Sequence, residues 1–302
     1  MHMNLNNIKN IILKAKNCIL SNRQRTFYCV VSAALAIIAL FSVISIIRIR
    51  HRSAIQLMDV SKTQELFTVS KSAELTAKDL SLNDISSSDD VKLPLVTDET
   101  TNEPDAWYLS IDVDLEALSE QNTDIVGWIY FENEESISYP LLFSGDDHYL
   151  RRNYLGEKDV AGSIYIDGHN DPSLSDAHTL IYGHNMRNLS MFGNLKLYRN
   201  EEGYYEGHRY FQLITKEAAY RYEIFSYKEV EVLTGGIYTI WHYVDDDFKE
   251  FVKNEIIAGS YIDAELNVEN DTHIVTLSTC TYENPDNRFT VSAVRVDEHK
   301  WK

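Results

Sequence analysis

The sequence predicts a mainly β protein, built as a closed β-barrel and preceded by one membrane-spanning helix. Two observations indicate the barrel: short strand-like runs recur through the second half of the chain, and turn-forming residues separate them. The helix is indicated by a long uncharged apolar segment near the N-terminus. The 302 residues are enough for one or two domains with a substantial core.

The apolar segment covers residues 27–47, which are 21 residues without a charge. As a helix it would be about 30 Å long, which matches the hydrocarbon core of a bilayer. A buried helix of a soluble protein would carry a polar stripe, and a cleavable signal peptide would have a shorter apolar core and a small-residue cleavage site. Here Arg48 follows directly, so we expect an uncleaved signal anchor at 27–47.

The net charge of −18 is divided unevenly along the chain. Residues 1–52 contain eight basic and no acidic side chains, whereas residues 53–302 contain 20 basic and 46 acidic ones, a net charge of −26. The basic residues on both sides of 27–47 modestly favour a cytoplasmic segment at 1–26 and an external body. That acidic body argues against nucleic acid as a partner, because phosphate binding needs a basic surface.

Residues 48–105 are predicted to be an extracytoplasmic stalk or linker. Of these, 53–105 contain 11 acidic and 14 Ser or Thr residues, no Gly, and Phe67 as the one aromatic residue. Such a composition buries too little apolar surface to fold tightly. All four tryptophans and 18 of the 19 tyrosines follow residue 105, so we expect the folded domain over residues 106–302.

The folded domain is predicted to begin with a helix at Leu109–Gln121, which has acidic residues near its start. Two further helices are expected at Phe192–Tyr198 and at Asp247–Ala258, where apolar residues recur at helical spacing. The expected strands are Val126–Phe131, Ile137–Leu142, Ser163–Ile166, Thr179–Tyr182, Tyr210–Thr215, Ala219–Val232, His273–Thr279 and Phe289–Val296.

Cys280 is the one cysteine of the part expected outside the membrane, because Cys18 and Cys29 lie in the basic segment and the apolar span. It follows the strand-like run His273–Thr279, so it lies at a strand end that can face a cleft. The thiolate is the nucleophilic form of cysteine, and a free thiol has a pKa of about 8.5. A reactive Cys280 therefore needs a cationic or basic neighbour.

Arg288 lies eight residues after Cys280, at the start of the next strand and beyond a turn-rich segment. A hairpin would bring its guanidinium beside the cysteine, where it could stabilise a thiolate or a tetrahedral oxyanion. The alternative is a buried Cys280 that acts as a small hydrophobe and a surface arginine beside Asp286. Spacing alone gives the two interpretations similar weight.

His184 is the candidate base, because it ends the apolar run Thr179–Gly183 at a boundary between strand and loop. Six other histidines of the domain are in polar loops or at strand edges, where a solvated imidazole is expected: His148, His169, His178, His208, His242 and His273. The spacing of His169, His178 and His184 matches no compact zinc pattern, so we expect no metal site.

Three motifs resemble those of the sortases, the cysteine transpeptidases of Gram-positive bacteria. They are Thr276-Leu-Ser-Thr-Cys280, the downstream Arg288, and Tyr182-Gly-His-Asn-Met186. The likeness covers about 106–296 and is strongest to class B, in which an N-terminal helix precedes the barrel and a helix lies in the connection before the cysteine strand. The segments Tyr139–Leu142, Tyr149-Leu150 and Gly162–Ile164 also resemble class B.

The resemblance implies a sortase-like barrel, a catalytic domain over 106–302 and no cofactor. Cys280 would attack a sorting-signal peptide bond and form a thioacyl enzyme, His184 would transfer protons, and Arg288 would stabilise the oxyanion. Ser278 and Thr279 would line the substrate site. The implied partners are surface proteins with a C-terminal sorting signal, and an amine from a peptidoglycan precursor or a pilin lysine.

One segment departs from the class B pattern. Class B sequences often carry an Asn shortly before the Tyr-Leu pair, where this chain has Gly145-Asp-Asp-His148. Whether Asp146 or Asp147 replaces a substrate-binding Asn is open at this point.

Two other functions compete with transpeptidation. A hydrolytic cysteine protease would use the same three residues and resolve the acyl enzyme with water. An inactive sortase-like binding module would keep the fold while Cys280 only packs. The presence of Cys280, His184 and Arg288 together argues against the inactive module.

Overall fold

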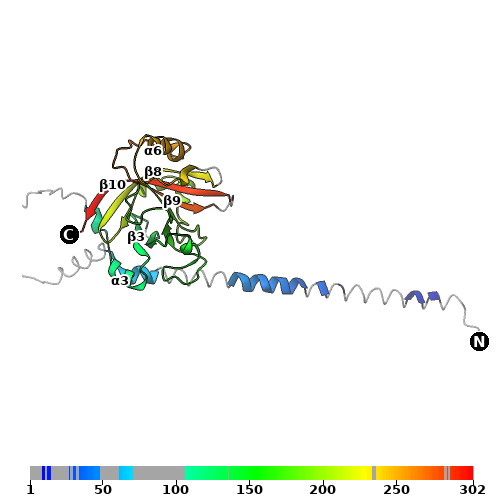
Figure 1. Cartoon of the computed structure of the whole chain (residues 1–302). Coiled ribbons are helices and arrows are strands. Elements are labelled where there is room, and N and C mark those ends of the chain that lie inside the picture. The colour runs from blue at the N-terminus through cyan, green and yellow to red at the C-terminus, as the bar shows by residue number, and fades with distance from the viewer. Residues whose placement is uncertain are drawn as a thin grey trace, which may run out of the picture. The chain divides into compact units, whose positions relative to one another are not determined.

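The computed structural model describes residues 61–70, most of 106–301, and short helical stretches nearer the N-terminus (Figure 1). Within 106–301 it leaves out 135, 233–235, 282–283 and 285; before residue 61 it describes 9–10, 12–14, 27, 30–31 and 34–47. The chain divides into two compact units, Met1–Leu57 and Met58–Lys302.

In the first unit, residues 34–47 are helical, and their large apolar side chains are mostly exposed, as at Leu40 and Phe41. They belong to the apolar segment 27–47. None of the helices formed by the described residues is long and apolar enough to cross a membrane.

Residues 61–70 belong to the second unit and pack against its folded domain. Residues 61–67 are helical, and β1 (Thr68–Ser70) pairs in antiparallel fashion with β2 (Ile111–Val113). The Gln64 side-chain amide donates a hydrogen bond to the Ser138 carbonyl at 2.8 Å, and Phe67 packs on an apolar cluster of this unit. This short part of the stretch assigned to the stalk thus contacts the folded domain, and the rest of 48–105 lies outside the described residues.

Eight strands of the described chain form the closed barrel that the sequence predicts. Their order is β10–β8–β7–β3–β4–β5–β6–β9, and β9 pairs with β10 to close the barrel. Neighbours are antiparallel except in the pairs β4–β5 and β6–β9. The strands are β3 (Ile125–Phe131), β4 (Ser138–Leu142), β5 (Ile164–Ile166), β6 (His178–Tyr182), β7 (Tyr210–Ile214), β8 (Ala218–Glu231), β9 (Ile274–Cys280) and β10 (Asn287–Lys300).

The interior of the barrel is packed with apolar side chains. Successive side chains of a strand point to opposite faces, so Val275 and Leu277 of β9 enter the core together with Phe289 of β10. Ser278 and Cys280 alternate with these residues and therefore face outward. The Ser278 and Cys280 side chains thus lie on the outer wall of the barrel, while their neighbours hold the strand in the core.

The helix predicted at Leu109–Gln121 is shorter in the structure, where α3 covers Leu115–Gln121. The Asp114 carboxylate accepts a hydrogen bond from the Ala117 amide at 2.8 Å, which caps the helix and sets its start. The preceding residues form the 3₁₀ turn η1 (Trp107–Leu109) and β2. Leu118 is fully buried in a cluster on the outer wall of the barrel.

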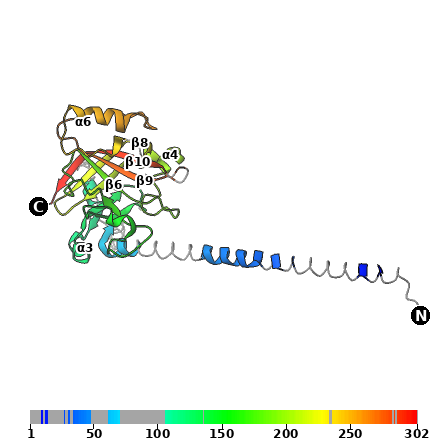
Figure 2. The same ribbon diagram turned by 45° about the vertical axis from the view of Figure 1, so that its right-hand side comes forward.

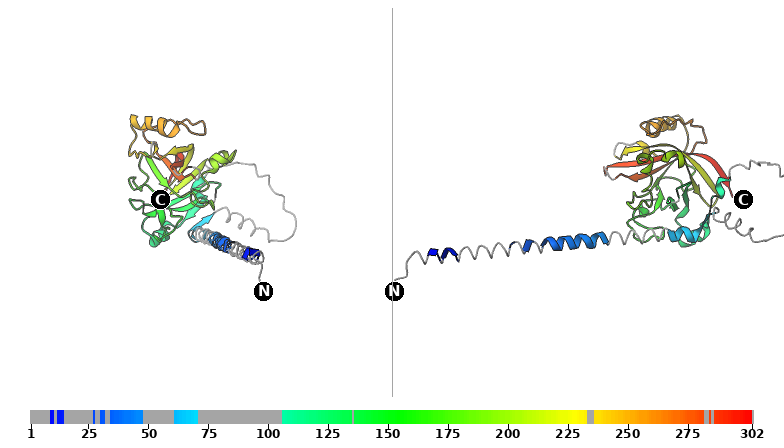
Figure 3. Two further views of the ribbon diagram at one scale, coloured as in Figure 1. Left: turned by 90° about the vertical axis from the view of Figure 1, so that its right-hand side faces the viewer. Right: turned by 180° about the vertical axis from the view of Figure 1, so that it is seen from behind.

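The connection from β8 to β9 contains η3 (Gly236–Tyr238), α6 (Asp246–Phe251) and the π-helical turn η4 (Val252–Ile257). Together α6 and η4 confirm the helix expected at Asp247–Ala258, and Phe248 and Ile256 are fully buried. Figures 1 and 2 show α6 across the barrel from α3, and Figure 3 shows α6 over the strands from two further sides. The connection therefore covers the outer wall near β8 and β9.

The helix predicted at Phe192–Tyr198 is wrong for residues 192–196, because α4 covers only Leu197–Asn200. A second short helix, α5, follows at Tyr204–Gly207. Leu189 and Met191 adopt positive φ angles of 68° and 54°, and the Phe192 amide donates to the His184 carbonyl at 3.0 Å. The apolar residues that suggested a helix instead place the turn around His184 on the core.

Candidate active site

The candidate residues meet on three neighbouring strands, in the order β6–β9–β10. Cys280 ends β9 and lies directly opposite Arg288 near the start of β10, so both side chains leave the same face of the sheet. Tyr182 ends β6 beside Ser278 of β9. The strand pairing thus brings the cysteine, the arginine and the loop after β6 to one end of the barrel wall.

Cys280 is partly exposed in a cleft with a volume of about 390 Å³. The cleft is lined by Leu150, Ser163, Tyr165, Tyr182, Gly183, His184, Val232, Tyr238, Ser278, Thr279, Cys280 and Arg288. All five candidate residues of the sequence analysis are in this lining. The alternative of a packed, inaccessible cysteine does not describe this position, because the thiol lies in an open cleft.

His184 is placed by the two residues on either side of it. The Gly183 amide donates to the Ser278 carbonyl at 3.2 Å, which continues the β6–β9 pairing by one residue. A Cβ at Gly183 would lie 2.4 Å from the Ile164 side chain and 2.7 Å from the Phe192 ring, so a larger residue would displace the turn. The Asn185 side-chain amide donates to the Cys280 carbonyl at 2.8 Å. These bonds fix the His184 backbone against the end of β9.

The imidazole of His184 has one nitrogen already engaged. Its Nε2 lies 2.8 Å from the carbonyl oxygen of Leu150. Leu150 is the last but one residue of the 3₁₀ turn η2 (His148–Arg151). Because a carbonyl only accepts hydrogen bonds, Nε2 must carry a hydrogen. In the neutral ring Nδ1 is then the basic nitrogen, so the Leu150 contact selects which nitrogen can exchange a proton.

Arg288 and Tyr238 form the opposite side of the cleft. The Arg288 Nη1 donates to the Asn287 carbonyl at 2.9 Å, which anchors the guanidinium beside its own strand. The Tyr238 hydroxyl, from η3, lies 3.0 Å from the Ser278 hydroxyl. Burial raises the pKa of Tyr238, although the Ser278 hydrogen bond and the Arg288 charge partly oppose this rise. Tyr238 therefore stays a neutral phenol that ties the β8–β9 connection to the cysteine strand.

Ser278 and Thr279 occupy different positions although they are consecutive. Ser278 faces outward beside Cys280 and bonds to Tyr238, whereas Thr279 is 2% exposed and pairs with Phe289 across β10. The Thr279 hydroxyl has no hydrogen-bond partner among the described residues. Ser278 thus presents its hydroxyl to the cleft, and Thr279 contributes to the lining from the buried side of the strand.

Sequence reasoning assigned no role to several residues at this site, among them Asn185, Tyr165 and Tyr238. Asn185 is adjacent to His184 within the motif Tyr182-Gly-His-Asn-Met186, so the sequence contained a signal that could have identified it. Tyr238 lies in a part of the β8–β9 connection that has no recognisable sequence pattern. Tyr165 lies between two isoleucines in a three-residue strand, so its sequence context suggests a core residue. Their contributions depend on which segments the barrel brings together.

His178 is a correction to the sequence analysis, which expected a solvated imidazole. It lies in β6 and is fully buried, with Nδ1 2.8 Å from the Thr239 carbonyl oxygen and Nε2 2.9 Å from the Thr276 hydroxyl. Burial lowers its pKa to about 4, against smaller opposing effects of the Thr239 bond and the Asp176 charge. His178 is thus a neutral link between β6, β9 and the segment after η3.

The described residues include no group of three or more His, Cys, Asp or Glu side chains that could hold a metal ion. His169 instead pairs with Asp167, with 2.9 Å between Nδ1 and Oδ1, and His242 pairs with Asp176 at 2.7 Å.

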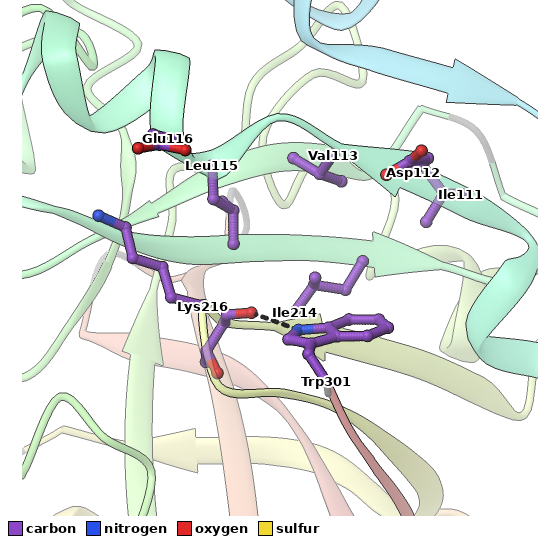
Figure 4. A pocket seen from close by; sticks show the side chains of 9 residues that line it. Ile111, Asp112, Val113, Leu115, Glu116, Ile214, Lys216 and Trp301 are labelled. Atoms are coloured by element: carbon purple, nitrogen blue, oxygen red, sulfur yellow. Dashed lines mark hydrogen bonds between the residues drawn. The ribbon is translucent and has the colours of Figure 1, made fainter.

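A second groove, of about 520 Å³, lies between the β2–α3 segment and the turn after β7 (Figure 4). Its floor is apolar, with Leu115 and Ile214, and its rim carries Asp112 and Glu116. The Trp301 indole borders it and donates to the Thr215 carbonyl at 2.9 Å. No cysteine or histidine is among the described residues that line it, so it offers no nucleophile or imidazole base.

Comparison with known proteins decides the family. The sortase domain model matches residues 136–296, which include every residue that lines the cleft. The chain belongs to the sortase family. This sortase is 35% identical to sortase B of Listeria monocytogenes over 176 residues, which are 56% of this chain and 68% of that protein. It is 32% identical to sortase B of Staphylococcus aureus over 181 residues, which are 59% and 72% of the two chains.

Solved sortase structures agree with this assignment. Sortase B of Clostridium perfringens has 27% sequence identity and a TM-score of 0.55, covering 61% of this chain and 100% of that chain. A sortase B–substrate complex from Staphylococcus aureus has 30% identity and a TM-score of 0.54, covering 60% and 84%. The protein is therefore a cysteine transpeptidase of the sortase B type.

His178 provides a test of the buried network by pH. Its pKa of about 4 in the folded protein is below the ordinary 6.5, so the unfolded chain binds the proton first as the pH falls. The stability linked to His178 is complete above pH 6.5 and is lost between pH 6.5 and 4, by about 3 kcal/mol in total. In His178→Gln, urea unfolding across this range should show a shallower loss of stability than in the unsubstituted protein.

The control is His148→Gln, which removes an exposed imidazole. It should leave the pH slope of the unfolding free energy unchanged. Equal slopes in the unsubstituted protein and His178→Gln would show that His178 is not the group responsible.

Proposed function

We propose that the protein is a membrane-anchored class B sortase in which Cys280 is the nucleophile, His184 the general acid and base, and Arg288 the oxyanion donor. One observation carries this proposal. Cys280 and Arg288 are directly paired between β9 and β10, and the Gly183 and Asn185 hydrogen bonds hold His184 against the same end of β9.

In the first half of the reaction, the Cys280 thiolate attacks the carbonyl carbon of a sorting-signal peptide bond. The new C–S bond converts the carbonyl to a tetrahedral oxyanion, which the Arg288 guanidinium stabilises from the neighbouring strand. The C–N bond then breaks, and the protonated His184 gives its Nδ1 proton to the departing amine. The product is a thioacyl enzyme, and the released segment leaves the cleft.

The substrate lies along the cleft past Ser278, whose hydroxyl is held by Tyr238 3.0 Å away. In this proposal Ser278 offers a hydrogen bond to the peptide, and Thr279 shapes the lining beside it. Surface proteins with a C-terminal sorting signal are the proposed acyl donors. The solved complex of the Staphylococcus aureus relative with its substrate supports a substrate-binding role for this chain.

In the second half, an amine attacks the thioester and joins the acyl group to a second molecule. The proposed amine belongs to a peptidoglycan precursor or a pilin lysine. Anchoring to the membrane through residues 27–47 would keep the enzyme where both partners pass, with residues 1–26 in the cytoplasm. The support is the uncharged run of 21 residues between basic flanks and the acidic body that follows it.

Replacing the nucleophile tests the covalent step. In Cys280→Ala, peptide cleavage and the thioacyl adduct detected by intact-protein mass spectrometry should both disappear, while circular dichroism stays unchanged. Cleavage retained by Cys280→Ala would contradict the proposal. With the unsubstituted protein and a saturating amine, hydrolysis as the sole product would favour the protease instead, and failure of iodoacetamide to alkylate Cys280 would favour the inactive binding module.

Removing the oxyanion donor should slow chemistry more than binding. Arg288→Gln should lower kcat for peptide cleavage about 10²- to 10³-fold and change KM little, because the oxyanion exists only after attack. The matched control is Arg209→Gln, which removes an exposed guanidinium paired with Glu223 and should leave kcat unchanged. A proportionate rise in KM at constant kcat would assign Arg288 to ground-state binding.

The anchor is tested by fractionation of cells that express the full chain or residues 58–302, which correspond to the second compact unit. The full chain should sediment with membranes and need detergent for release, whereas 58–302 should be soluble and cleave the same peptide. Recovery of the full chain in the soluble fraction after mild lysis would contradict the anchor.

A further inference from the structure

The proton transfer proposed for His184 depends on one backbone carbonyl, that of Leu150. The carbonyl oxygen lies 2.8 Å from Nε2 of the imidazole and accepts the hydrogen there, which leaves Nδ1 as the basic nitrogen of the neutral ring. An imidazole without such a contact can carry its hydrogen on either nitrogen. The position of the Leu150 carbonyl therefore decides how much of the enzyme has the tautomer that the reaction needs.

The segment that leads into β5 packs closely on the backbone of η2. Gly162 has a φ of 58°, and a Cβ there would lie 2.6 Å from the Leu150 carbonyl oxygen and 2.8 Å from that of Tyr149. The Ser163 amide donates a hydrogen bond to the Tyr149 carbonyl at 3.0 Å. Residues 162–163 thus limit the movement of η2 at the carbonyl that His184 contacts.

The side chain of Tyr149 ties η2 to a second element. It is 2% exposed and lies in the same apolar cluster as Leu118 of α3. Its hydroxyl donates to the Asp124 carboxylate and accepts from the Asn122 side-chain amide, both at 2.7 Å. Burial raises the pKa of Tyr149 to about 12, although the Asn122 hydrogen bond opposes the rise. The phenol is therefore neutral at physiological pH and retains the proton that it donates to Asp124.

Asn122 is a fixed partner for Tyr149, because its whole side chain is engaged. It is the C-terminal cap of α3, where its backbone amide donates to the Leu118 carbonyl at 3.1 Å. Its side-chain amide also donates to the Tyr154 carbonyl at 2.7 Å, and its Oδ1 accepts from the Asp124 backbone amide at 3.0 Å. The end of α3 thus anchors the Tyr149 hydroxyl, and through it the η2 turn.

We propose that Tyr149 is a positioning residue, which selects the reactive tautomer of His184 by holding the Leu150 carbonyl in place. The inference rests on the proposed function, in which Nδ1 of His184 transfers the protons. Tyr149 is not among the described residues that line the cleft, so it acts through Leu150 and not on the substrate. Because the anchor is the end of α3, the helix before the barrel helps to set the geometry of proton transfer.

The first test removes the hydroxyl alone. Tyr149→Phe should lower kcat for peptide cleavage about three- to tenfold, the contribution of one ordinary hydrogen bond, and leave KM unchanged. The matched control is Tyr154→Phe, which removes a phenol hydroxyl beside the same cluster and keeps the carbonyl that Asn122 contacts. It should leave kcat and KM unchanged. An unchanged kcat in Tyr149→Phe, or an equal loss in Tyr154→Phe, overturns the proposal.

The second test reads the tautomer and does not depend on turnover. The nitrogen chemical shifts of the His184 ring are measured in a Cys280→Ala background at about pH 9, above the ordinary histidine pKa of about 6.5, and His184→Gln assigns them. In this background Nε2 should carry the hydrogen. Adding Tyr149→Phe should move the two nitrogen shifts towards each other as the tautomers mix. Identical shifts with and without Tyr149→Phe overturn the proposal, because the hydroxyl would then not influence the tautomer.

The third test asks whether Asn122 and Tyr149 act along one path. Asn122→Ala removes the amide that donates to Tyr149 and should also lower kcat. The double variant Asn122→Ala/Tyr149→Phe should lose no more than the larger of the two single effects, since each breaks the same anchor. Fully additive losses overturn the path from α3. Absence of any thioacyl adduct in the unsubstituted protein would instead refute the proposed function, while the tautomer measurement would still decide the role of Tyr149.

Discussion

The pairing of β9 with β6 on one side and β10 on the other is the constraint on which the site depends. It determines that Cys280 and Arg288 lie opposite each other and that His184 follows β6 at the same level. A shift of one residue in either pairing would turn one partner into the barrel core, since side chains alternate between faces. The core residues Val275 and Leu277 resist such a shift, because it would also expose them. The apolar packing of the barrel thus maintains the alignment of polar groups on its outer wall.

The β8–β9 connection adds a second layer of restraint. Its η3 turn brings Tyr238 to Ser278, and the Thr239 carbonyl beside it receives the buried His178. His178 reaches Thr276, and the Thr276 hydroxyl lies 2.8 Å from that of Ser292 on β10. One hydrogen-bonded chain therefore crosses from the connection through β6 and β9 to β10. These contacts link the β8–β9 connection to the strands that bear Cys280 and Arg288.

Local patterns predicted the parts of the fold that local chemistry decides. The eight strands, the helix at Asp247–Ala258 and the Cys280–Arg288 hairpin all follow from alternation, helical spacing and turn residues. The prediction failed where contacts between distant segments determine the local structure or the burial of a side chain. The apolar residues of 192–198 have helical spacing, but they line a turn that packs on the core, and His178 is buried only because Thr239 and Thr276 come to it.

The parallel β6–β9 pair has a consequence for how the chain acquires its reactivity. It joins segments that are far apart in sequence, as the 95-residue separation of Asn185 and Cys280 shows. Contacts of such long range form slowly, because the chain between the two residues must lose conformational entropy as the loop closes before the contacts can stabilise it. A chain still emerging from the ribosome has His184 long before Cys280 and Arg288, and no β9 against which to align it. Cys280 therefore gains its neighbours on β6 and β10 only when the barrel closes, so the cleft is assembled by the completion of folding.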